Sequence, residues 1–230
     1  MNVLVACEES QTVTKALRER GHEAYSCDVL DTSGDHSEWH IKADVLPLLN
    51  GDCNFCTMDG VQHTIIGKWD MIIAFPPCTK TTNAGARHLY AGGKLNIPRY
   101  YEGMCGKALF MAIYHAECDK IAIENPTPSL VFNFPEPSQI IQPYEFGELA
   151  TKRTCLWLKG LPPLVPRNPV PRPIYREIRQ KNGKIRKTCW VMEQKGEKTA
   201  QGNAQKHFRE LQRQWQNNGQ ILRNEGGHKE

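Results

Sequence analysis

The stretch Trp69-Asp-Met-Ile-Ile-Ala-Phe-Pro-Pro-Cys78 is a short apolar run that stops at two prolines. Proline has no N–H to give to a neighbouring strand, so a central strand cannot continue through it. The pattern therefore predicts a buried strand over residues 69–75. It also predicts that Cys78, which follows the rigid proline pair, is exposed at the edge of a sheet.

Runs of the same kind recur on both sides of this stretch. We expect strands over residues 3–7, 22–28, 41–45, 120–123 and 154–158, helices over 11–20 and 99–116, and a hairpin or loop over 51–67. Short apolar strands that alternate with helices are typical of an α/β fold. The sequence thus predicts an open, mostly parallel sheet with helices on both faces.

Polar residues follow several of the predicted strands. In an open parallel sheet the ligand binds beyond the carboxyl ends of the strands. Glu8, Ser10 and Gln11 follow the first strand, whereas Asp28 and Asp44 follow the second and third. Because carboxylates accept hydrogen bonds from ribose hydroxyls and an adenine amino group, we predict a nucleoside-type cofactor site at this edge.

Charge is divided unevenly along the chain. Residues 1–150 carry 11 Lys and Arg against 19 Asp and Glu, and residues 151–230 carry 18 against 6. A basic C-terminal third on an acidic body favours a polyanion-binding face, with a merely solvated basic tail as the alternative. No apolar run reaches the ~18 residues of a membrane span, so we expect no membrane partner. Nine scattered cysteines favour a reducing compartment, and we expect a cytoplasmic protein.

Composition also divides the chain into parts. Residues 1–160 are predicted to form the core, and residues 161–199 a proline-rich, then basic segment. Within that segment Lys181-Asn-Gly-Lys184 is a hairpin signal. Residues 200–230 are predicted to form a helix that returns to the core, followed by a tail.

Four motifs resemble those of the cytosine-C5 DNA methyltransferases, and they occur in that family's order. They are the Pro-Pro-Cys strand that ends at Cys78, Ile121-Ala-Ile-Glu-Asn-Pro126, Thr151-Lys-Arg-Thr-Cys-Leu-Trp-Leu-Lys-Gly160 and Ala200-Gln-Gly-Asn-Ala204. The resemblance implies a class I methyltransferase fold, S-adenosylmethionine as cofactor and duplex DNA with a flipped cytosine as substrate. It adds Pro76 and Asn203 to the expected cofactor-binding residues.

The resemblance also implies catalytic roles. Cytosine C5 attacks a methyl group only after a thiolate has added at C6, and Cys78 is the expected nucleophile. Glu124 is the expected acid that hydrogen-bonds N3 of the base. Arg153 is expected to hold the base carbonyl or a neighbouring phosphate.

The chain departs from the family pattern at three places. Ala6-Cys-Glu-Glu-Ser-Gln-Thr12 contains none of the glycines of the family's first motif, and Thr151 and Cys155 replace a Gln and an Arg. Only residues 161–199 remain for target recognition, which indicates a small, phage-like member. The expected DNA-binding residues there are Arg172, Arg176, Arg179, Lys181, Lys184, Arg186 and Lys187. By family analogy, residues 79–98 form a mobile loop that closes over the base, with Arg87 reaching phosphate.

Two other functions remain open at this point. One is modification of pyrimidine C5 on a free nucleotide, as in thymidylate synthase or deoxycytidylate hydroxymethylase. The other is a catalytically degenerate protein that binds nucleic acid through its basic end. Cys53-x-x-Cys56 with His63 is reminiscent of a zinc site, but no second cysteine pair follows at finger spacing, so we predict no metal site.

Overall fold

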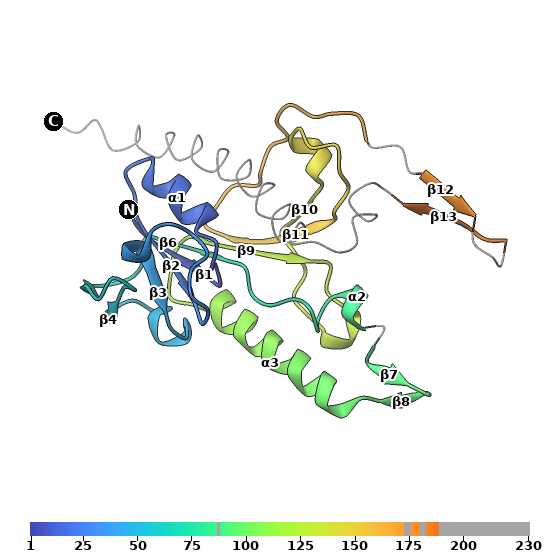
Figure 1. Ribbon diagram of the computed structural model, residues 1–230, viewed down its shortest axis with the longest axis horizontal. Helices are drawn as coiled ribbons and strands as arrows, with labels where there is room; N and C mark the ends of the chain where they lie inside the picture. Colours follow the sequence, from blue (N-terminus) through green and yellow to red (C-terminus); the bar gives the residue numbers. More distant parts are fainter. Residues whose placement is uncertain (87, 173–175, 180–182, 189–230) are drawn as a thin grey trace. The chain divides into compact units, whose positions relative to one another are not determined.

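The computed structural model describes residues 1–86, 88–172, 176–179 and 183–188 (Figure 1). The chain divides into two units. The first comprises Met1–Ile140 and Thr154–Pro163, and the second comprises Ile141–Arg153 and Leu164–Glu230. No helix in the described ranges is both long enough and apolar enough to span a bilayer.

A seven-stranded sheet in the order β3-β2-β1-β6-β9-β11-β10 is the centre of the fold. Its strands are β1 (Asn2–Ala6), β2 (Glu23–Asp28), β3 (His40–Lys42), β6 (Met71–Ala74), β9 (Ile121–Pro126), β10 (Gln139–Ile141) and β11 (Thr154–Lys159). Strands β3, β2, β1, β6 and β9 pair in parallel, whereas β11 pairs antiparallel with β9. The predicted α/β fold with a mostly parallel sheet is confirmed at this level.

Helices and hairpins make up the rest of the described chain. They are α1 (Thr12–Arg18), α2 (Asn83–Ala86), α3 (Ile97–Tyr114), the 3₁₀ turns η1 (Ser37–Trp39), η2 (Leu46–Leu48), η3 (Leu130–Phe132) and η4 (Pro143–Phe146), and the hairpins β4 (Cys53–Cys56) with β5 (Gln62–Ile65), β7 (Tyr90–Ala91) with β8 (Lys94–Leu95), and β12 (Arg176–Arg179) with β13 (Ile185–Thr188). Residues 51–67, for which a hairpin or a loop was expected, contain the β4–β5 hairpin, and the hairpin predicted around residues 181–184 is confirmed by the pairing of β12 with β13. The segment after Cys78, predicted as a long loop, instead contains α2 and the β7–β8 hairpin.

The first strands are buried on both faces, which explains their nearly continuous apolar sequences. Val3, Leu4, Val5 and Ala6 of β1 are all fully buried. α1 and α3 lie on opposite sides of the sheet (Figure 1). A strand covered on both faces has no polar side to show, so an alternating pattern is absent.

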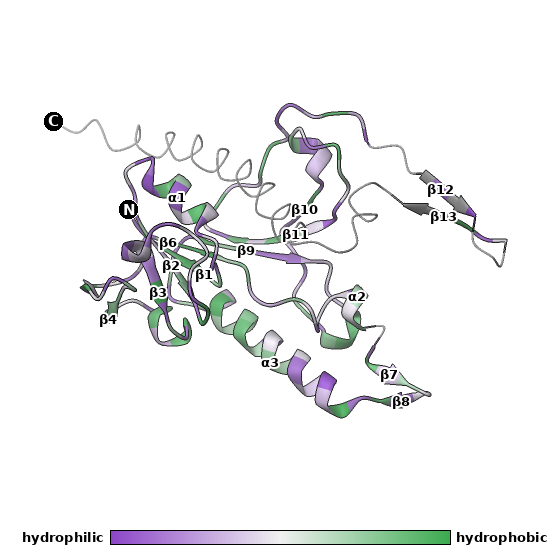
Figure 2. Cartoon of the chain, viewed as in Figure 1, coloured by the Kyte–Doolittle hydropathy of each residue, from purple (hydrophilic) through white to green (hydrophobic). Residues whose placement is uncertain are grey.

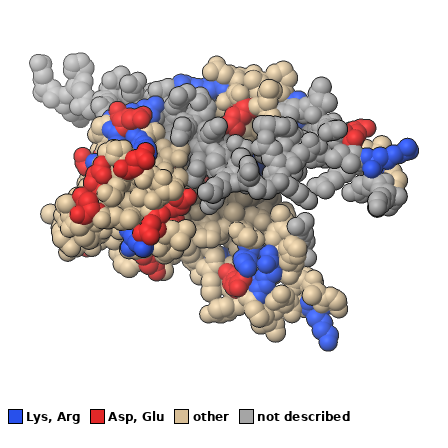
Figure 3. Space-filling view, in the orientation of Figure 1, with Lys and Arg blue, Asp and Glu red and all other residues tan. Residues whose placement is uncertain are grey.

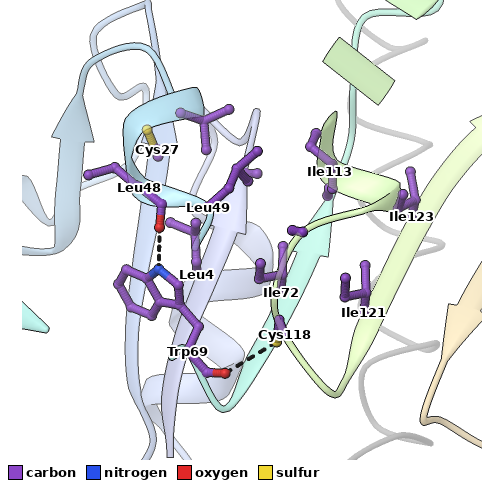
Figure 4. Close-up of a cluster of buried hydrophobic side chains, with 14 of the residues drawn as sticks. Leu4, Cys27, Leu48, Leu49, Trp69, Ile72, Ile113, Cys118, Ile121 and Ile123 are labelled. Atoms are coloured by element: carbon purple, nitrogen blue, oxygen red, sulfur yellow. Dashed lines mark hydrogen bonds between the residues drawn. The ribbon is translucent and has the colours of Figure 1, made fainter. Parts of the chain in front are cut away.

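Trp69, at the start of the Pro-Pro-Cys stretch, fixes the position of the chain just before β6. Its ring is buried, and Nε1 donates to the carbonyl of Leu48 at 2.6 Å (Figure 4). The Trp69 carbonyl accepts from the Cys118 thiol at 3.2 Å, just before β9 (Figure 4). These contacts hold the entries of two neighbouring strands together.

The two halves of helix α3 pack against different parts of the protein. The C-terminal half is apolar (Figure 2) and contributes Phe110 and Ile113 to the core under the sheet. The N-terminal half begins at the cap Asn96, whose side chain accepts from Arg99 N at 3.2 Å. There Gly103 faces the buried ring of Phe132, leaving no space for a side chain.

We expect Gly103→Ala to destabilise the protein. The added methyl would overlap the Phe132 ring, which is buried. That ring also stacks on the Tyr100 ring, with 5.7 Å between the two ring centroids. Overpacking of this kind costs about 1–3 kcal/mol of unfolding free energy. Gly106→Ala is the matched control, because its added methyl would meet only Pro77 O at 3.5 Å and Thr81 Cγ2 at 3.7 Å.

Urea denaturation of both variants tests this packing. Gly106→Ala should be neutral or stabilising by up to about 1 kcal/mol, because alanine favours a helix interior over glycine. A Gly103→Ala protein as stable as the control would contradict the close approach of α3 to η3.

Candidate functional site at the carboxyl edge of the sheet

The carboxyl ends of five parallel strands meet at one edge of the sheet. The register places Ala6 beside Cys27 on one side and Ala74 on the other. Cys27 in turn pairs with Ile41, and Ala74 pairs with Ile123. The residues that follow these five positions therefore emerge together, as the sequence predicted for the polar strand ends.

Cys78 lies at this edge in a well-fixed turn. Phe75 N donates to Ala6 O at 3.0 Å, which holds the end of β6 against β1. Pro76 is buried, Pro77 is exposed and Cys78 is partly exposed. The Cys78 carbonyl accepts from the backbone N–H groups of Thr81 and Thr82, each at 3.1 Å. The proline pair and these hydrogen bonds fix the backbone that carries the thiol.

The segment after Cys78 is tied to the segment after β9. Thr82 forms a bridge with Pro128. Asn83 N donates to Thr127 O at 3.3 Å, and Ser129 N donates to Thr81 O at 2.8 Å. The Pro-Pro-Cys and Glu-Asn-Pro motifs, more than 40 residues apart in sequence, are thereby held side by side.

Glu124 and Asn125 occupy the carboxyl half of β9. They pair with Leu156 and Cys155 of β11, so the third motif lies alongside the second. Successive strand residues face opposite sides of a sheet, so these two side chains point to different faces. Glu124 is partly exposed, whereas Asn125 is buried with an Oδ1 that accepts no hydrogen bond within the described chain.

Glu8 is buried and binds the start of α1. Its carboxylate accepts from the backbone N–H groups of Val13 and Thr14 and from the Thr14 hydroxyl. The first N–H groups of a helix have no partner within it, and Glu8 supplies one. Its carboxylate oxygens are thus bound within the protein, although the sequence predicted that they face a cofactor.

Gln11 and Ser10 are likewise engaged locally. Gln11 is fully buried, and its Nε2 donates to the His36 carbonyl at 2.6 Å. Its Oε1 accepts from His36 N at 3.2 Å, which ties the loop after β2 to the start of α1. The Ser10 hydroxyl donates to the Thr12 hydroxyl at 3.2 Å.

The β1–α1 connection takes glycine-like conformations without glycine. Cys7 has φ 58° and Gln11 has φ 56°, both in the left-handed region. Such conformations cost ordinary residues of order 1–3 kcal/mol and persist where surrounding structure imposes them. The missing glycines of the first motif are therefore replaced by strained residues, held by the contacts of Glu8 and Gln11.

Asp28 and Asp44 gather near Cys7 at the ends of β1, β2 and β3. Burial, followed by the negative charges of Asp28 and Asp44, raises the pKa of the Cys7 thiol to about 12. Asp28 Oδ1 accepts from Leu30 N and Asp44 Oδ1 from Leu46 N, each at 3.0 Å. The other oxygen of each carboxylate has no hydrogen-bond donor within the described chain.

The Glu8 carboxyl makes stability depend on pH. Burial raises its pKa from 4.5 to about 7, although the hydrogen bonds from Val13 and Thr14 lower it. Between these two values the unfolded chain releases a proton that the folded chain keeps, so stability falls as pH rises. The unfolding free energy falls by about 3 kcal/mol in total. The decrease begins above pH 4.5 and is complete above pH 7.

Glu8→Gln should remove this dependence, because an amide does not ionise. The unmodified protein should lose unfolding free energy when the pH is raised from 5 to 7.5, and the variant should not. Urea denaturation of both proteins at both pH values measures the difference. At pH 5 the variant should be the less stable protein, since its NH₂ group cannot accept from Thr14. Parallel pH profiles for the two proteins would show that Glu8 is not the responsible group.

Arg153 comes just before Thr154, which pairs with Pro126 at the carboxyl end of β9. Arg153 is exposed, directly precedes β11 and belongs to the second unit. Of the predicted DNA-binding residues, Arg172, Arg179 and Lys184 are exposed in the second unit; Arg176, also in the second unit, is on β12, and Arg186 and Lys187 are on β13. Arg87, Lys181, Asn203 and the helix predicted within residues 200–230 fall outside the described residues.

His63, which follows the Cys53-x-x-Cys56 pattern, has a hydroxyl near each of its ring nitrogens. Its Nδ1 lies 3.2 Å from the Tyr25 hydroxyl and its Nε2 lies 3.0 Å from the Thr57 hydroxyl. Cys53 is buried and Cys56 is exposed, as expected for strand residues three positions apart, which face opposite sides. Within the described ranges, no three His, Cys, Asp or Glu side chains are grouped to hold a metal ion.

Sequence reasoning missed Arg99 as a residue of this region. Its Nη2 donates to Gly85 O at 3.1 Å, and its buried Nε has no partner in the described chain. The Asn96 cap followed by Pro98 marks the start of a helix and was the available signal. Arg99 thus links α3 to α2, which begins five residues after Cys78.

Comparison with known proteins adds no family. No protein-family model matches the chain, and a search of curated proteins returns no match.

Proposed function

We propose that this chain is an S-adenosylmethionine-dependent methyltransferase that modifies C5 of cytosine in DNA through Cys78. The observation that carries the proposal is the backbone connection between residues 81–83 and 127–129. It holds a cysteine on a rigid turn next to a strand that carries a carboxyl group, at the ligand-binding edge of a parallel sheet. A nucleophile and an acid in neighbouring positions are the two groups this reaction needs.

The order of the strands supports the class of fold. Counted along the chain, the parallel strands lie in the order 3-2-1-4-5, the order of doubly wound nucleotide-binding sheets. The order reverses between β1 and β6, which is where the crevice for a ligand opens in such folds. The antiparallel β11 between β9 and β10 is the further feature that makes a class I methyltransferase sheet the best match.

The proposed reaction uses Cys78 first as nucleophile and then as leaving group. Its thiolate forms a bond to C6, and the electron pair of the C5–C6 double bond becomes available at C5. Glu124 in its acid form hydrogen-bonds N3 and stabilises the charge that accumulates on the ring. After C5 has gained the methyl group, removal of its proton expels the thiolate and restores the double bond.

The residues at the ends of β2 and β3 fit the nucleoside part of S-adenosylmethionine, which supplies the electrophilic methyl group. Asp28 and Asp44 each direct one oxygen to the backbone and have a second oxygen for ribose hydroxyls or an adenine amino group. Glu8 and Gln11 fit less well, because both side chains are bound within the protein. We therefore assign cofactor recognition to the aspartates and to backbone groups of the β1–α1 connection.

Asp28→Ala should weaken binding of S-adenosylmethionine. Loss of a hydrogen bond to a charged group costs about 1–3 kcal/mol, which corresponds to roughly five- to 150-fold in affinity. Isothermal titration calorimetry measures the change. The matched control is Asp31→Ala, an exposed carboxylate on the same loop that pairs with Lys42 at 2.8 Å. Unchanged affinity for Asp28→Ala would remove this residue from the site.

A methyl-transfer assay on duplex DNA tests the function itself. The full chain is incubated with DNA and S-adenosylmethionine that carries a labelled methyl group, and the DNA is then digested to nucleosides. Label in 5-methyldeoxycytidine is the expected result. Label on an exocyclic amino group, or an unlabelled DNA, would overturn the proposal.

A further inference from the structure

Three fully buried polar side chains, here called the His40 network, lie together beside the loop after β2. Ser26 of β2 pairs with His40 of β3 in the sheet register, and Gln11 precedes α1. Cys27 and Ile41, the next residues on the two strands, point to the other face and belong to the apolar core there. A buried polar group without a hydrogen bond destabilises a fold, so the partners of these three side chains explain how they are tolerated.

Hydrogen bonds join the His40 network into one continuous path. Gln11 Nε2 donates to Ser26 Oγ at 3.4 Å, and Ser26 Oγ lies 2.8 Å from His40 Nδ1. His40 Nε2 lies 3.0 Å from the carbonyl of Leu30, which can only accept, so Nε2 carries the proton. In a neutral ring Nδ1 then accepts from the Ser26 hydroxyl, whose other acceptor, Trp39 O, is farther away at 3.3 Å.

Leu30 connects the His40 network to the proposed cofactor site. Its carbonyl accepts from His40, while its N–H donates to Asp28 Oδ1 at 3.0 Å. The Leu30 side chain is 59% exposed, so these two backbone contacts, and not side-chain packing, fix the residue. A shift of the Leu30 carbonyl would therefore move the turn that orients the Asp28 carboxylate.

The other end of the network lies in the β1–α1 connection. Gln11 has φ 56°, and its side-chain amide also binds the backbone N–H and carbonyl of His36. The proposed function assigns cofactor recognition to this connection and to the aspartates at the strand ends. The His40 network therefore joins two parts of the proposed cofactor site through the interior of the protein.

The charge at this end of the unit fits the proposed cofactor. Residues 8–44 carry nine Asp or Glu against four Lys or Arg. Figure 3 shows acidic side chains gathered over the end of the sheet with α1 and β3. S-adenosylmethionine carries a positive sulfonium, whereas nucleotides carry negative phosphates, so this charge favours the sulfonium compound.

We propose that His40 is a positioning residue, which acts through Leu30 to orient the Asp28 carboxylate toward the nucleoside part of the cofactor. Ser26 and Gln11 hold the imidazole ring in the orientation that this requires. Apolar side chains could cover this face of the sheet without any polar group to satisfy, so the position that the network fixes explains why it is polar. The identity of the ligand rests on the proposed function.

Two substitutions of His40 separate its two hydrogen bonds. His40→Gln places an amide N–H near the position of Nε2 and can still donate to Leu30, whereas His40→Asn reaches only the position of Nδ1. Isothermal titration calorimetry should show S-adenosylmethionine affinity within about twofold of the unmodified protein for His40→Gln. For His40→Asn the affinity should fall about three- to tenfold. His36→Asn is the matched control, because the His36 backbone, and not its side chain, binds Gln11.

A double-variant comparison shows whether His40 acts through Asp28. In an Asp28→Ala protein the carboxylate is absent, so His40→Asn should cause no further loss of affinity. In an Asp31→Ala protein the full effect should remain, because Asp31 pairs with Lys42 on the surface. Equal losses with and without Asp28, or equal affinities of the Asn and Gln variants, would overturn the positioning role.

Amide exchange tests the network without any ligand. The Leu30 N–H should exchange faster in His40→Asn than in the unmodified protein or in His40→Gln, as measured by NMR. Unchanged exchange in His40→Asn would overturn the role of His40 even in an active methyltransferase. Faster exchange in a protein that binds no S-adenosylmethionine would support the positioning of Asp28 and overturn the proposed function.

Ser26→Ala gives a second, smaller change if His40→Asn does not fold. It removes the hydroxyl that holds His40 Nδ1 and leaves the ring and the Leu30 carbonyl in place. Cofactor affinity should fall, and exchange of the Leu30 N–H should quicken, in the same direction as in His40→Asn. A folded Ser26→Ala protein in which both quantities are unchanged would overturn the proposal.

Discussion

Replacing Cys78 with serine is expected to abolish methyl transfer and covalent trapping together. If Cys78 adds to C6, a duplex that contains 5-fluorocytosine cannot complete the reaction, because C5 carries fluorine in place of the proton that must leave. The protein and DNA should then remain joined by a bond that survives denaturation. A serine hydroxyl is far less ionised than a thiol near neutral pH, so Cys78→Ser should form no such complex.

Cys105→Ser is the matched control for this experiment. Cys105 is another free cysteine of the same unit, exposed on α3. The control should methylate and trap like the unmodified protein. Trapping that persists in Cys78→Ser would assign the nucleophile elsewhere. Trapping of free 5-fluoro-dCMP without trapping of DNA would shift the function to a free pyrimidine nucleotide.

Glu124→Gln is expected to slow the chemical step without weakening the binding of DNA. An amide cannot give a proton to N3, and loss of a general acid typically lowers kcat by roughly a hundredfold or more. Glu124 lies in the middle of the β9–β11 pairing, and glutamine has the same shape, so the strand should be undisturbed. Single-turnover methylation and DNA-binding anisotropy measure the two effects separately.

Glu117→Gln provides the comparison for Glu124→Gln. Glu117 is an exposed carboxylate that precedes β9, with only a 3.8 Å pairing to Lys68. Its replacement should leave both rate and affinity unchanged. An equal loss of DNA affinity and rate in Glu124→Gln would make Glu124 a binding or structural residue and not the acid.

The sequence by itself determined the strands that are buried on both faces and the point where β6 ends. A short apolar run such as residues 71–74, followed by prolines, favours a strand covered on both faces, and the proline pair ends the pairing of that strand. The same local logic placed Asp28 at the end of β2 and predicted the β4–β5 and β12–β13 hairpins. These features follow from a few neighbouring residues, so local chemistry suffices to predict them.

Only the tertiary structure decided which polar side chains are bound within the protein. Glu8 lies just after β1 and Asp28 is the last residue of β2. No local sequence pattern distinguishes a carboxylate whose two oxygens bind the start of a helix from one that has an oxygen without a hydrogen-bond donor. The difference depends on Val13 and Thr14 turning back over Glu8 and on the loop of His36 reaching Gln11. The connection of Thr82 to Pro128 likewise joins distant segments through backbone groups. Every residue has a backbone carbonyl and every residue except proline has an N–H, so such a connection leaves no distinctive pattern in the sequence.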